Sequence, residues 1–177
     1  VGMRLQTQIP KAEKPLRILI LGGTGFIGPH QVRYALARGH KLTLFNRGKT
    51  HPGLFPEVVN LEGDRQLSQL DALKTGEWDA IIDNPSTLPR WVREAAGLLK
   101  GRAQQYVFIS TVSVYSDNSI KGMDENAPLA TTTDPNDEKI TGNNYGALKA
   151  LSEKEAEKAF PGQTTVIRPG LIVGPGD

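Results

Sequence analysis

A glycine-rich segment, residues 22–28, constrains the fold of this chain more than any other feature. It follows a short apolar run, residues 16–21, and overlaps a pattern of apolar residues at helical spacing, residues 26–38. This order predicts a strand, a tight turn and a helix. The glycines recur as G-x-x-G-x-x-G. Such a turn lets the backbone approach a pyrophosphate, which then lies on free N–H groups at the helix N-terminus.

We therefore expect a dinucleotide site at this turn; the alternative is a glycine-rich turn without a ligand. The last glycine is expected to allow close packing of the helix on the strand. The residues expected to form the cofactor site here are Gly22, Gly25, Phe26, Ile27 and Gly28.

Strand and helix patterns alternate along the rest of the chain. Further strands are predicted at residues 41–45, 58–61, 78–83, 106–110 and 164–167, and helices at residues 67–74, 88–99 and 145–159. This alternation predicts an α/β fold, a doubly wound parallel sheet with helices on both faces. Residues 116–144 are rich in Asp, Asn, Pro and Thr without a sustained period. A long excursion of this kind is typical of a lid or a substrate loop.

The composition limits the class of protein. The 177 residues suffice for one α/β domain, since domains run to about 100–200 residues. The net charge is only +2 and the Lys and Arg residues are scattered, so we do not expect nucleic acid as a partner. No apolar run approaches the ~18–20 residues that a membrane span needs, so no membrane partner is expected. The chain has no cysteine, which excludes disulfides and thiolate ligands, and we expect no metal centre.

Two segments are expected along the chain, a flexible N-terminal tail (residues 1–15) and an NAD(P)-binding Rossmann domain (residues 16–177). The tail begins with Val1 and is polar and proline-containing, as after removal of a leader. We expect a cytoplasmic protein, with export after leader removal as the alternative. The chain ends in a turn-forming sequence directly after the sixth predicted strand. We therefore expect a fragment that is truncated before a substrate lobe.

The second predicted strand ends in Asn46 and Arg47, where an NAD-binding protein usually offers an acid to the adenosine ribose. Asn46 can hydrogen-bond a hydroxyl, while Arg47, together with Lys49, can neutralise a 2′-phosphate. This pattern favours NADP over NAD as the cofactor. The alternative is that Arg47 and Lys49 are solvated turn residues.

Two more strand ends carry polar residues that we expect beside the cofactor. Asp64 and Arg65 follow the third strand; Asp64 can accept a hydrogen bond from the adenine amino group, or it can cap the next helix. Asp83 and Asn84 end the fourth strand and are expected beneath the cofactor, because ligands bind outside the carboxyl ends of parallel strands. The alternative for this segment is a turn made by Pro85.

Tyr145 and Lys149 are four residues apart in the last predicted helix, so they share one helix face. A nearby ammonium favours the phenolate, so the pair can move a proton; the alternative is a packed Tyr beside a solvated Lys. The fifth strand ends in hydroxyl residues. Thr111 is the choice for binding a substrate oxygen, and Ser110 and Ser113 are its competitors.

Five motifs occur in a characteristic order: residues 22–28, residues 63–64, residues 110–115, Tyr145 with Lys149, and residues 168–175. In them the chain resembles the extended short-chain dehydrogenases/reductases of the NAD-dependent epimerase/dehydratase family, from about residue 16 to residue 177. The resemblance implies NADP or NAD as the cofactor. It also implies hydride transfer to or from a small-molecule substrate such as a sugar nucleotide. The catalytic set that it implies is Thr111, Tyr145 and Lys149, of which Lys149 also contacts the cofactor.

Two segments depart from the pattern of the sugar-nucleotide enzymes. Residues 46–47 replace an acid, and residues 83–86 stand where an Ala-containing turn is usual. The turn at residues 46–48 also resembles that of the chloroplast stem-loop-binding proteins, non-catalytic relatives that bind RNA. A redox sensor that binds a dinucleotide and reports to a partner is a further alternative. The intact pair of Tyr145 and Lys149 favours an enzyme, and if the chain associates, a homodimer is the expected assembly.

Overall fold

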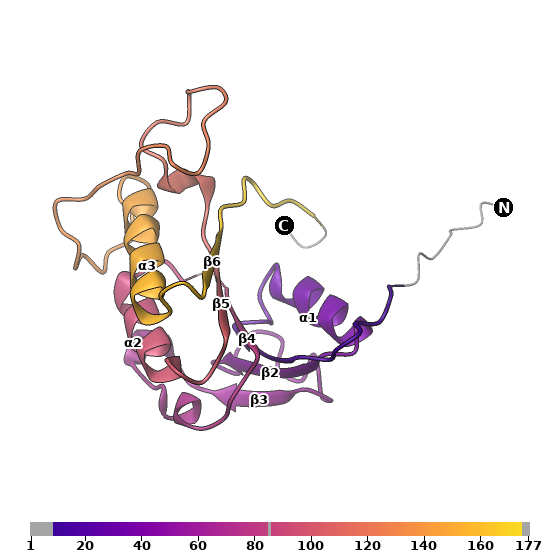
Figure 1. The fold of residues 1–177 in the computed structure, drawn as a ribbon. Coiled ribbons are helices and arrows are strands. Elements are labelled where there is room, and N and C mark those ends of the chain that lie inside the picture. The colour runs from indigo at the N-terminus through magenta and orange to yellow at the C-terminus, as the bar shows by residue number, and fades with distance from the viewer. Residues whose placement is uncertain (1–8, 85, 175–177) are drawn as a thin grey trace.

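Six parallel strands form one sheet in the computed structural model, which describes residues 9–84 and 86–174 (Figure 1). The strands are β1 (Arg17–Leu21), β2 (Lys41–Asn46), β3 (Val59–Glu62), β4 (Ala80–Asp83), β5 (Gln105–Ile109) and β6 (Thr164–Ile167). Their order across the sheet is β3-β2-β1-β4-β5-β6. The strand order therefore reverses at β1 and β4, and in such sheets ligands bind in the crevice outside the carboxyl ends of the strands at this point.

Helices cover both faces of the sheet. The α-helices are α1 (Gly28–Ala37), α2 (Pro89–Leu99) and α3 (Tyr145–Ala159), and the short 3₁₀ helices are η1 (Arg65–Leu67), η2 (Asp71–Lys74) and η3 (Val112–Val114). In Figure 1, α1 lies on one side of the sheet, and α2 and α3 lie together on the other. The predicted doubly wound α/β fold is confirmed.

The residues of β1 show why helices pack on both faces of the sheet. Ile20 packs with Val32 of α1 in one core, whereas the neighbouring Leu21 packs with Val92 of α2 in the other. Successive side chains of a strand point to opposite faces, so the unbroken apolar run of Ile18–Leu21 is buried on both faces.

The helix predicted at residues 67–74 is wrong. The chain forms the two short helices η1 and η2 there instead, because Ser68 between them has a φ of 53°. This left-handed conformation cannot continue a right-handed helix. Leu73 is fully buried in the core, so the apolar residues of the segment make core contacts from separate turns rather than from one helix face.

Residues 116–144 contain no helix and no strand, as their composition predicts. They extend past the start of α3 (orange in Figure 1). Tyr115 forms an isolated antiparallel bridge with Leu129, and Arg90 of α2 donates a hydrogen bond of 3.0 Å to Glu138. These contacts attach the excursion to the domain, as does the hydrogen bond of 3.0 Å from Arg168 to the Glu125 carbonyl oxygen.

Residues 9–15 of the predicted tail form no helix or strand, and the Ala12 N–H donates to the carbonyl oxygen of Arg38. The rest of the tail, Pro85 and residues 175–177 lie outside the described residues. Among the helices of the described part, none combines the length and the apolar character that crossing a membrane requires.

Candidate active site

A cavity of about 640 Å³ is lined by residues from the carboxyl ends of the strands. The glycine turn lies at its middle, because β1 stands between β2 and β4 in the sheet. The ends of β2 and β3 form one end of the cavity, and the end of β5 with the start of α3 forms the other. The predicted site residues that line it are Gly22, Gly25, Phe26, Ile27, Gly28, Asn46, Arg47, Asp64, Arg65, Asn84, Thr111, Tyr145 and Lys149.

The glycine turn has the backbone conformation and the open space that a diphosphate needs. Gly22 and Gly23 have φ values of 102° and 95°, in the region that favours glycine. A Cβ at Gly28 would lie 2.4 Å from the carbonyl carbon of Gly23, so α1 packs directly on the turn. A Cβ at Gly25 would meet no atom within 4 Å. Helix α1 also begins without a side-chain cap, which leaves N–H groups available for an anion.

The residues at the end of β2 differ in whether hydrogen bonds within the protein hold their side chains. Asn46 Nδ2 donates to Asn60 Oδ1 at 2.8 Å, and Asn46 Oδ1 accepts from the Gly48 N–H at 2.8 Å. Asn46 therefore stabilises the turn with both ends of its amide. Arg47 is exposed and lines the cavity, so its guanidinium can reach a ligand there.

Asp83 and Arg65 form a buried ion pair. Arg65 donates to both carboxylate oxygens of Asp83, at 2.6 and 2.9 Å, and the Tyr106 hydroxyl donates to the same carboxylate at 2.5 Å. Asp83 is fully buried and is not among the residues that line the cavity. The predicted cofactor contact of Asp83 is therefore corrected, because its carboxylate neutralises Arg65 inside the fold.

Burial and charge shift the protonation equilibria of this cluster. Burial raises the pKa of Tyr106 well above its usual value, and the charge of Asp83 adds to the rise. Burial opposes the charge on Arg65, but the pairing with Asp83 outweighs it, so the pKa of Arg65 is raised. Both groups keep their protons, and the cluster is one ion pair with a neutral phenol bonded to it.

Two further predicted residues lie at these strand ends. Asp64 Oδ1 accepts from the Gln66 N–H at 2.9 Å and caps η1, which is the alternative role that its sequence position allowed; Asp64 also borders the cavity. Asn84 Nδ2 donates to Gln31 Oε1 of α1 at 2.6 Å. Asn84 thereby joins the end of β4 to the first turns of α1 beneath the glycine turn.

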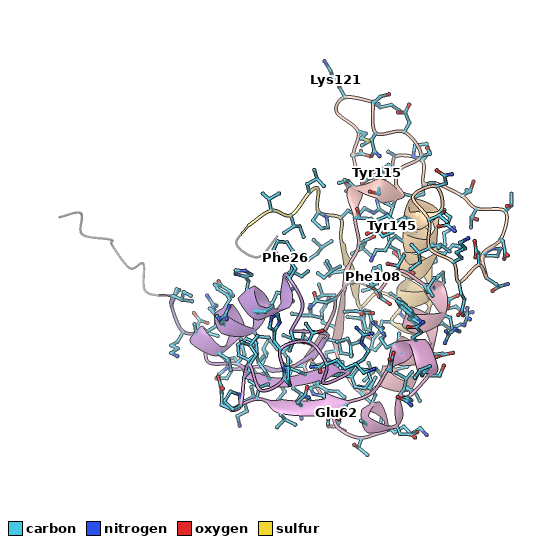
Figure 2. The ribbon with its side chains drawn as sticks, turned by 180° about the vertical axis from the view of Figure 1, so that it is seen from behind. Phe26, Glu62, Phe108, Tyr115, Lys121 and Tyr145 are labelled. Carbon is cyan, nitrogen blue, oxygen red and sulfur yellow. The ribbon has the colours of Figure 1, made fainter. Side chains whose placement is uncertain are left out.

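Tyr145 and Lys149 lie one helical turn apart at the start of α3 and line the same cavity. Figure 2 shows Tyr145 near the start of α3 and Phe26 near the start of α1. Phe26 precedes α1 and Tyr145 begins α3, so the two residues lie beside helices on opposite faces of the sheet. The cavity thus joins the glycine turn on one side to a phenol and an ammonium on the other.

Lys149 is held by backbone oxygens rather than by a carboxylate. Its Nζ donates to the carbonyl oxygens of Ser86 at 2.9 Å and Ile109 at 2.7 Å, and it lies 4.2 Å from the centroid of the Phe108 ring. Burial lowers the pKa of Lys149 to about 8, and nearby carboxylates partly oppose this shift. These two bonds use two of the three ammonium N–H donors.

Three hydroxyl groups follow β5, and they have different partners. Ser110 Oγ donates to the buried carboxylate of Glu153. Thr111 Oγ1 accepts from the Ser113 N–H at 3.1 Å and caps η3. All three hydroxyl residues line the cavity. The hydroxyl of Ser110 is engaged by the buried carboxylate of Glu153, whereas Thr111 Oγ1 donates to the exposed Ser113 Oγ at 3.2 Å. A substrate oxygen can replace this second bond, so Thr111 and Ser113 are the better placed to bind it.

Several residues that shape the site were not among the predicted site residues. A Cβ at Gly146 would lie 1.9 Å from the Ser113 carbonyl oxygen, so only glycine lets α3 approach η3 this closely. Arg168 donates to both carboxylate oxygens of Glu153, at 3.0 and 2.8 Å, which fixes the partner of Ser110. A glycine inside a helix is a signal that could have identified Gly146, because glycine is unfavourable there.

Two family models match the chain. The NAD dependent epimerase/dehydratase family matches residues 18–88, and an NAD-binding family described as male sterility protein matches residues 92–177. The first match covers the glycine turn and the first four strands, and the second covers the last two strands with Tyr145 and Lys149.

Curated relatives agree with these matches. The epimerase family protein SDR39U1 of Mus musculus is 26% identical, over 91% of this chain and 56% of that protein. The chloroplast stem-loop binding protein of 41 kDa b of Arabidopsis thaliana is 29% identical, over 62% of this chain and 32% of that protein. The chain spans about half the length of the epimerase-family relatives that it matches.

Solved structures share the fold. The UDP-Glc/GlcNAc 4-epimerase of Campylobacter jejuni superposes with a TM-score of 0.66 at 21% identity, over 86% of this chain and 52% of that chain. The Bordetella bronchiseptica enzyme WbmH in complex with NAD⁺ superposes with a TM-score of 0.68 at 18% identity, over 93% and 58% of the two chains. Both matches place the chain on a Rossmann fold.

The two family matches follow each other along one continuous Rossmann fold, and the cavity of that fold suits a nicotinamide dinucleotide. The motifs occur in the order that the resemblance requires. The comparisons together support an extended short-chain dehydrogenase/reductase, and the chain is similar to the NAD-dependent epimerase/dehydratase family over residues 18–88.

Proposed function

We propose that this chain is the cofactor-binding part of an NADP-preferring enzyme that transfers hydride between the cofactor and a hydroxyl-bearing carbon of a small molecule. The observation that carries the proposal is that Tyr145, Lys149 and Thr111 line the same cavity as the glycine turn. A sugar nucleotide is the proposed substrate class, supported by the epimerases that share the fold. Transient oxidation of such a substrate is a route to epimerisation or dehydration.

Each side chain of the proposed catalytic set has its own role in the reaction. A bound nicotinamide supplies the acceptor or donor of the hydride. Tyr145 takes the proton from the substrate hydroxyl and returns it in the reverse direction. The ammonium of Lys149, fixed by two backbone carbonyls, favours the phenolate by its charge. Thr111 binds the substrate oxygen and so orients the carbon that reacts.

The most direct test of this assignment replaces Tyr145 by Phe in the full-length protein. The variant should keep its affinity for the dinucleotide, because the ring remains, and should lose about 10²–10⁴-fold in turnover, as expected for a lost general acid or base. The matched control is Tyr34→Phe, since Tyr34 is exposed on α1. Unchanged turnover of Tyr145→Phe would remove the proposed role.

Arg47 supports NADP as the preferred cofactor. It lines the cavity after β2, and no acid stands beside it at position 46. Charge-assisted hydrogen bonds from Arg47 would stabilise a 2′-phosphate. Calorimetry should show tighter binding of NADP than of NAD, and Arg47→Ala should narrow the difference. Lys41→Ala is the control, because Lys41 is exposed at the other end of β2 and is not among the lining residues. Equal affinities for NADP and NAD in all three proteins would exclude the preference for NADP.

The RNA-binding alternative is not favoured. Tyr145 and Lys149 are both present, and the net charge of +2 offers little attraction to a polyanion. Titration of the chain with NADPH and with RNA separates the two functions directly.

A further inference from the structure

The segment between β2 and β3, residues 47–58, connects the wall of the cavity to the surface of α1. It contains no helix or strand. Arg47 and Thr50, near its start, line the cavity. Further along, the Phe55 ring lies beneath Arg33 of α1, with the guanidinium carbon 5.6 Å from the ring centroid. The segment is therefore held against α1 on one side and borders the ligand space on the other.

His51 joins this segment to the glycine turn. Its Nδ1 lies 3.1 Å from the carbonyl oxygen of Thr24. A carbonyl oxygen only accepts hydrogen bonds, so Nδ1 carries a proton and donates. Thr24 and Gly25 line the cavity from the glycine turn, and Thr50, which precedes His51, lines it from the other segment. The bond therefore connects two walls of the cavity.

The backbone of His51 has a conformation that histidine seldom adopts. Its φ is 46°, in the left-handed region that is unfavourable for a residue with a Cβ. Such a conformation persists only where the surrounding contacts hold it. The contacts here are the bond from the imidazole to Thr24 and a bond of 3.2 Å from the Leu54 N–H to the carbonyl oxygen of His51. The imidazole bond is thus part of what fixes this turn.

The same bond fixes one peptide plane of the glycine turn. The peptide between Thr24 and Gly25 is trans, so its C=O and N–H point in opposite directions. Because the carbonyl group is bonded to His51, the Gly25 N–H points away from His51. Glycine is conformationally free, and a Cβ at Gly25 would meet no atom within 4 Å. The imidazole therefore restrains a peptide that packing leaves free.

We propose that His51 is a positioning residue for the dinucleotide: it orients the Gly25 N–H and holds residues 47–58 against the glycine turn before the ligand binds. The inference rests on the proposed dinucleotide function and adds a residue outside the glycine motif. Groups that are already ordered lose less entropy when a ligand binds. The affinity of the chain for a diphosphate should therefore depend on a hydrogen-bond donor at position 51.

Two substitutions separate the hydrogen bond from the backbone conformation. Asn and Gly both accept a positive φ, and neither carries an imidazole. In His51→Asn, the amide Nδ2 takes the same position along the side chain as the imidazole Nδ1, so a donor remains. His51→Gly has no donor. Calorimetric titration of this chain with NADPH and with ADP-ribose, which both carry the diphosphate, compares the two variants with the parent.

His51→Asn should bind both ligands like the parent, and His51→Gly should bind them about fivefold more weakly, the scale of one hydrogen bond. The matched control is His40→Ala. His40 Nδ1 accepts from the Leu16 N–H at 3.0 Å, at the opposite end of β1, and does not line the cavity. This control also loses an imidazole and its bond to the backbone, yet should keep the parental affinities. Circular dichroism confirms that each variant folds.

The outcomes separate this inference from the proposed function. Parental affinity of His51→Gly would overturn the positioning role and leave the dinucleotide function intact. An equal loss in His51→Asn and His51→Gly, or the same loss in His40→Ala, would overturn it as well, since binding would then not follow the donor at position 51. If the parent binds neither NADPH nor ADP-ribose, the proposed function fails and the inference fails with it.

Discussion

At the scale of single residues, Gly146 sets how closely the helix of Tyr145 approaches the hydroxyl segment. An added Cβ would lie 1.9 Å from the Ser113 carbonyl oxygen, so η3 or α3 must move. Gly146→Ala should lower the free energy of unfolding by about 1–3 kcal/mol, measured by urea denaturation. Gly97→Ala on α2 is the control; its Cβ would meet nothing within 4 Å, and it should raise stability by about 0.5–1 kcal/mol. A Gly146→Ala variant as stable as Gly97→Ala would contradict the packing described.

Lys149 should give the stability of the chain a distinctive dependence on pH. Burial lowers the pKa of Lys149 to about 8 from its usual value of 10.5. Between these two values the unfolded chain binds more protons than the folded chain, so the free energy of unfolding rises with pH across this window. Below pH 8 the full cost of burying the ammonium remains.

The measurement compares the parent with Lys149→Met from pH 7 to pH 10.5. The stability of the parent relative to the variant should increase as the pH rises above 8, because the variant has no ammonium to neutralise. Other groups titrate in both proteins and cancel in the difference. A difference that stays flat over this range would show that Lys149 has an ordinary pKa in the fold.

At the scale of elements, the cluster of Arg65, Asp83 and Tyr106 joins η1, β4 and β5. Asp83→Ala leaves the cation of Arg65 buried without its partner and should lower the free energy of unfolding by about 3–5 kcal/mol. Tyr106→Phe removes one hydrogen bond and should cost about 1 kcal/mol. Asp71→Ala is the control, because Asp71 pairs with Lys74 at the surface and should change little. If the Asp83 and Asp71 variants unfold at the same urea concentration, the cluster does not stabilise the fold.

The regular elements could be predicted because each carries its own periodic pattern. The helix of residues 145–159 and the strand of residues 164–167 have the bounds that their sequences predict. The segment of residues 67–74 could not be predicted in this way, since one left-handed residue, Ser68, divides it. A single left-handed backbone angle does not change the spacing of apolar residues, so that spacing cannot predict it.

In the site, too, a residue could be predicted where its motif is local in the sequence, and could not where its role depends on a distant partner. The glycine turn, Thr111, Tyr145 and Lys149 line one cavity, and their motifs are local in sequence. The carboxylate of Asp83 depends on Arg65, which is 18 residues away, and on the order of the strands. Partners of this kind are fixed by the tertiary fold. The sequence pattern therefore predicts that Asp83 contacts the ligand, whereas its carboxylate pairs with Arg65 inside the protein.

At the scale of the whole molecule, the chain spans about half the length of its epimerase-family relatives. We expect it to fold and bind a dinucleotide, because six strands with helices on both faces already form a layered core. We expect no turnover, since holding reactants in place contributes about 7–11 kcal/mol to lowering a barrier. Steady NADPH consumption with a sugar nucleotide by this chain alone would show that residues 116–144 suffice as a substrate site.

We propose that the glycine turn holds a nicotinamide dinucleotide, and a substitution of Gly25 tests this binding without disturbing the fold. A Cβ at Gly25 meets no protein atom within 4 Å, so Gly25→Ala should fold like the parent, yet the methyl group would occupy the space that the diphosphate needs. Calorimetric titration with NADPH should show binding to the parent and to Gly97→Ala, and an affinity at least about tenfold lower, or 1.4 kcal/mol, for Gly25→Ala. Equal affinities of the parent and Gly25→Ala, or no heat of binding in the parent, would show that the glycine turn does not hold the dinucleotide.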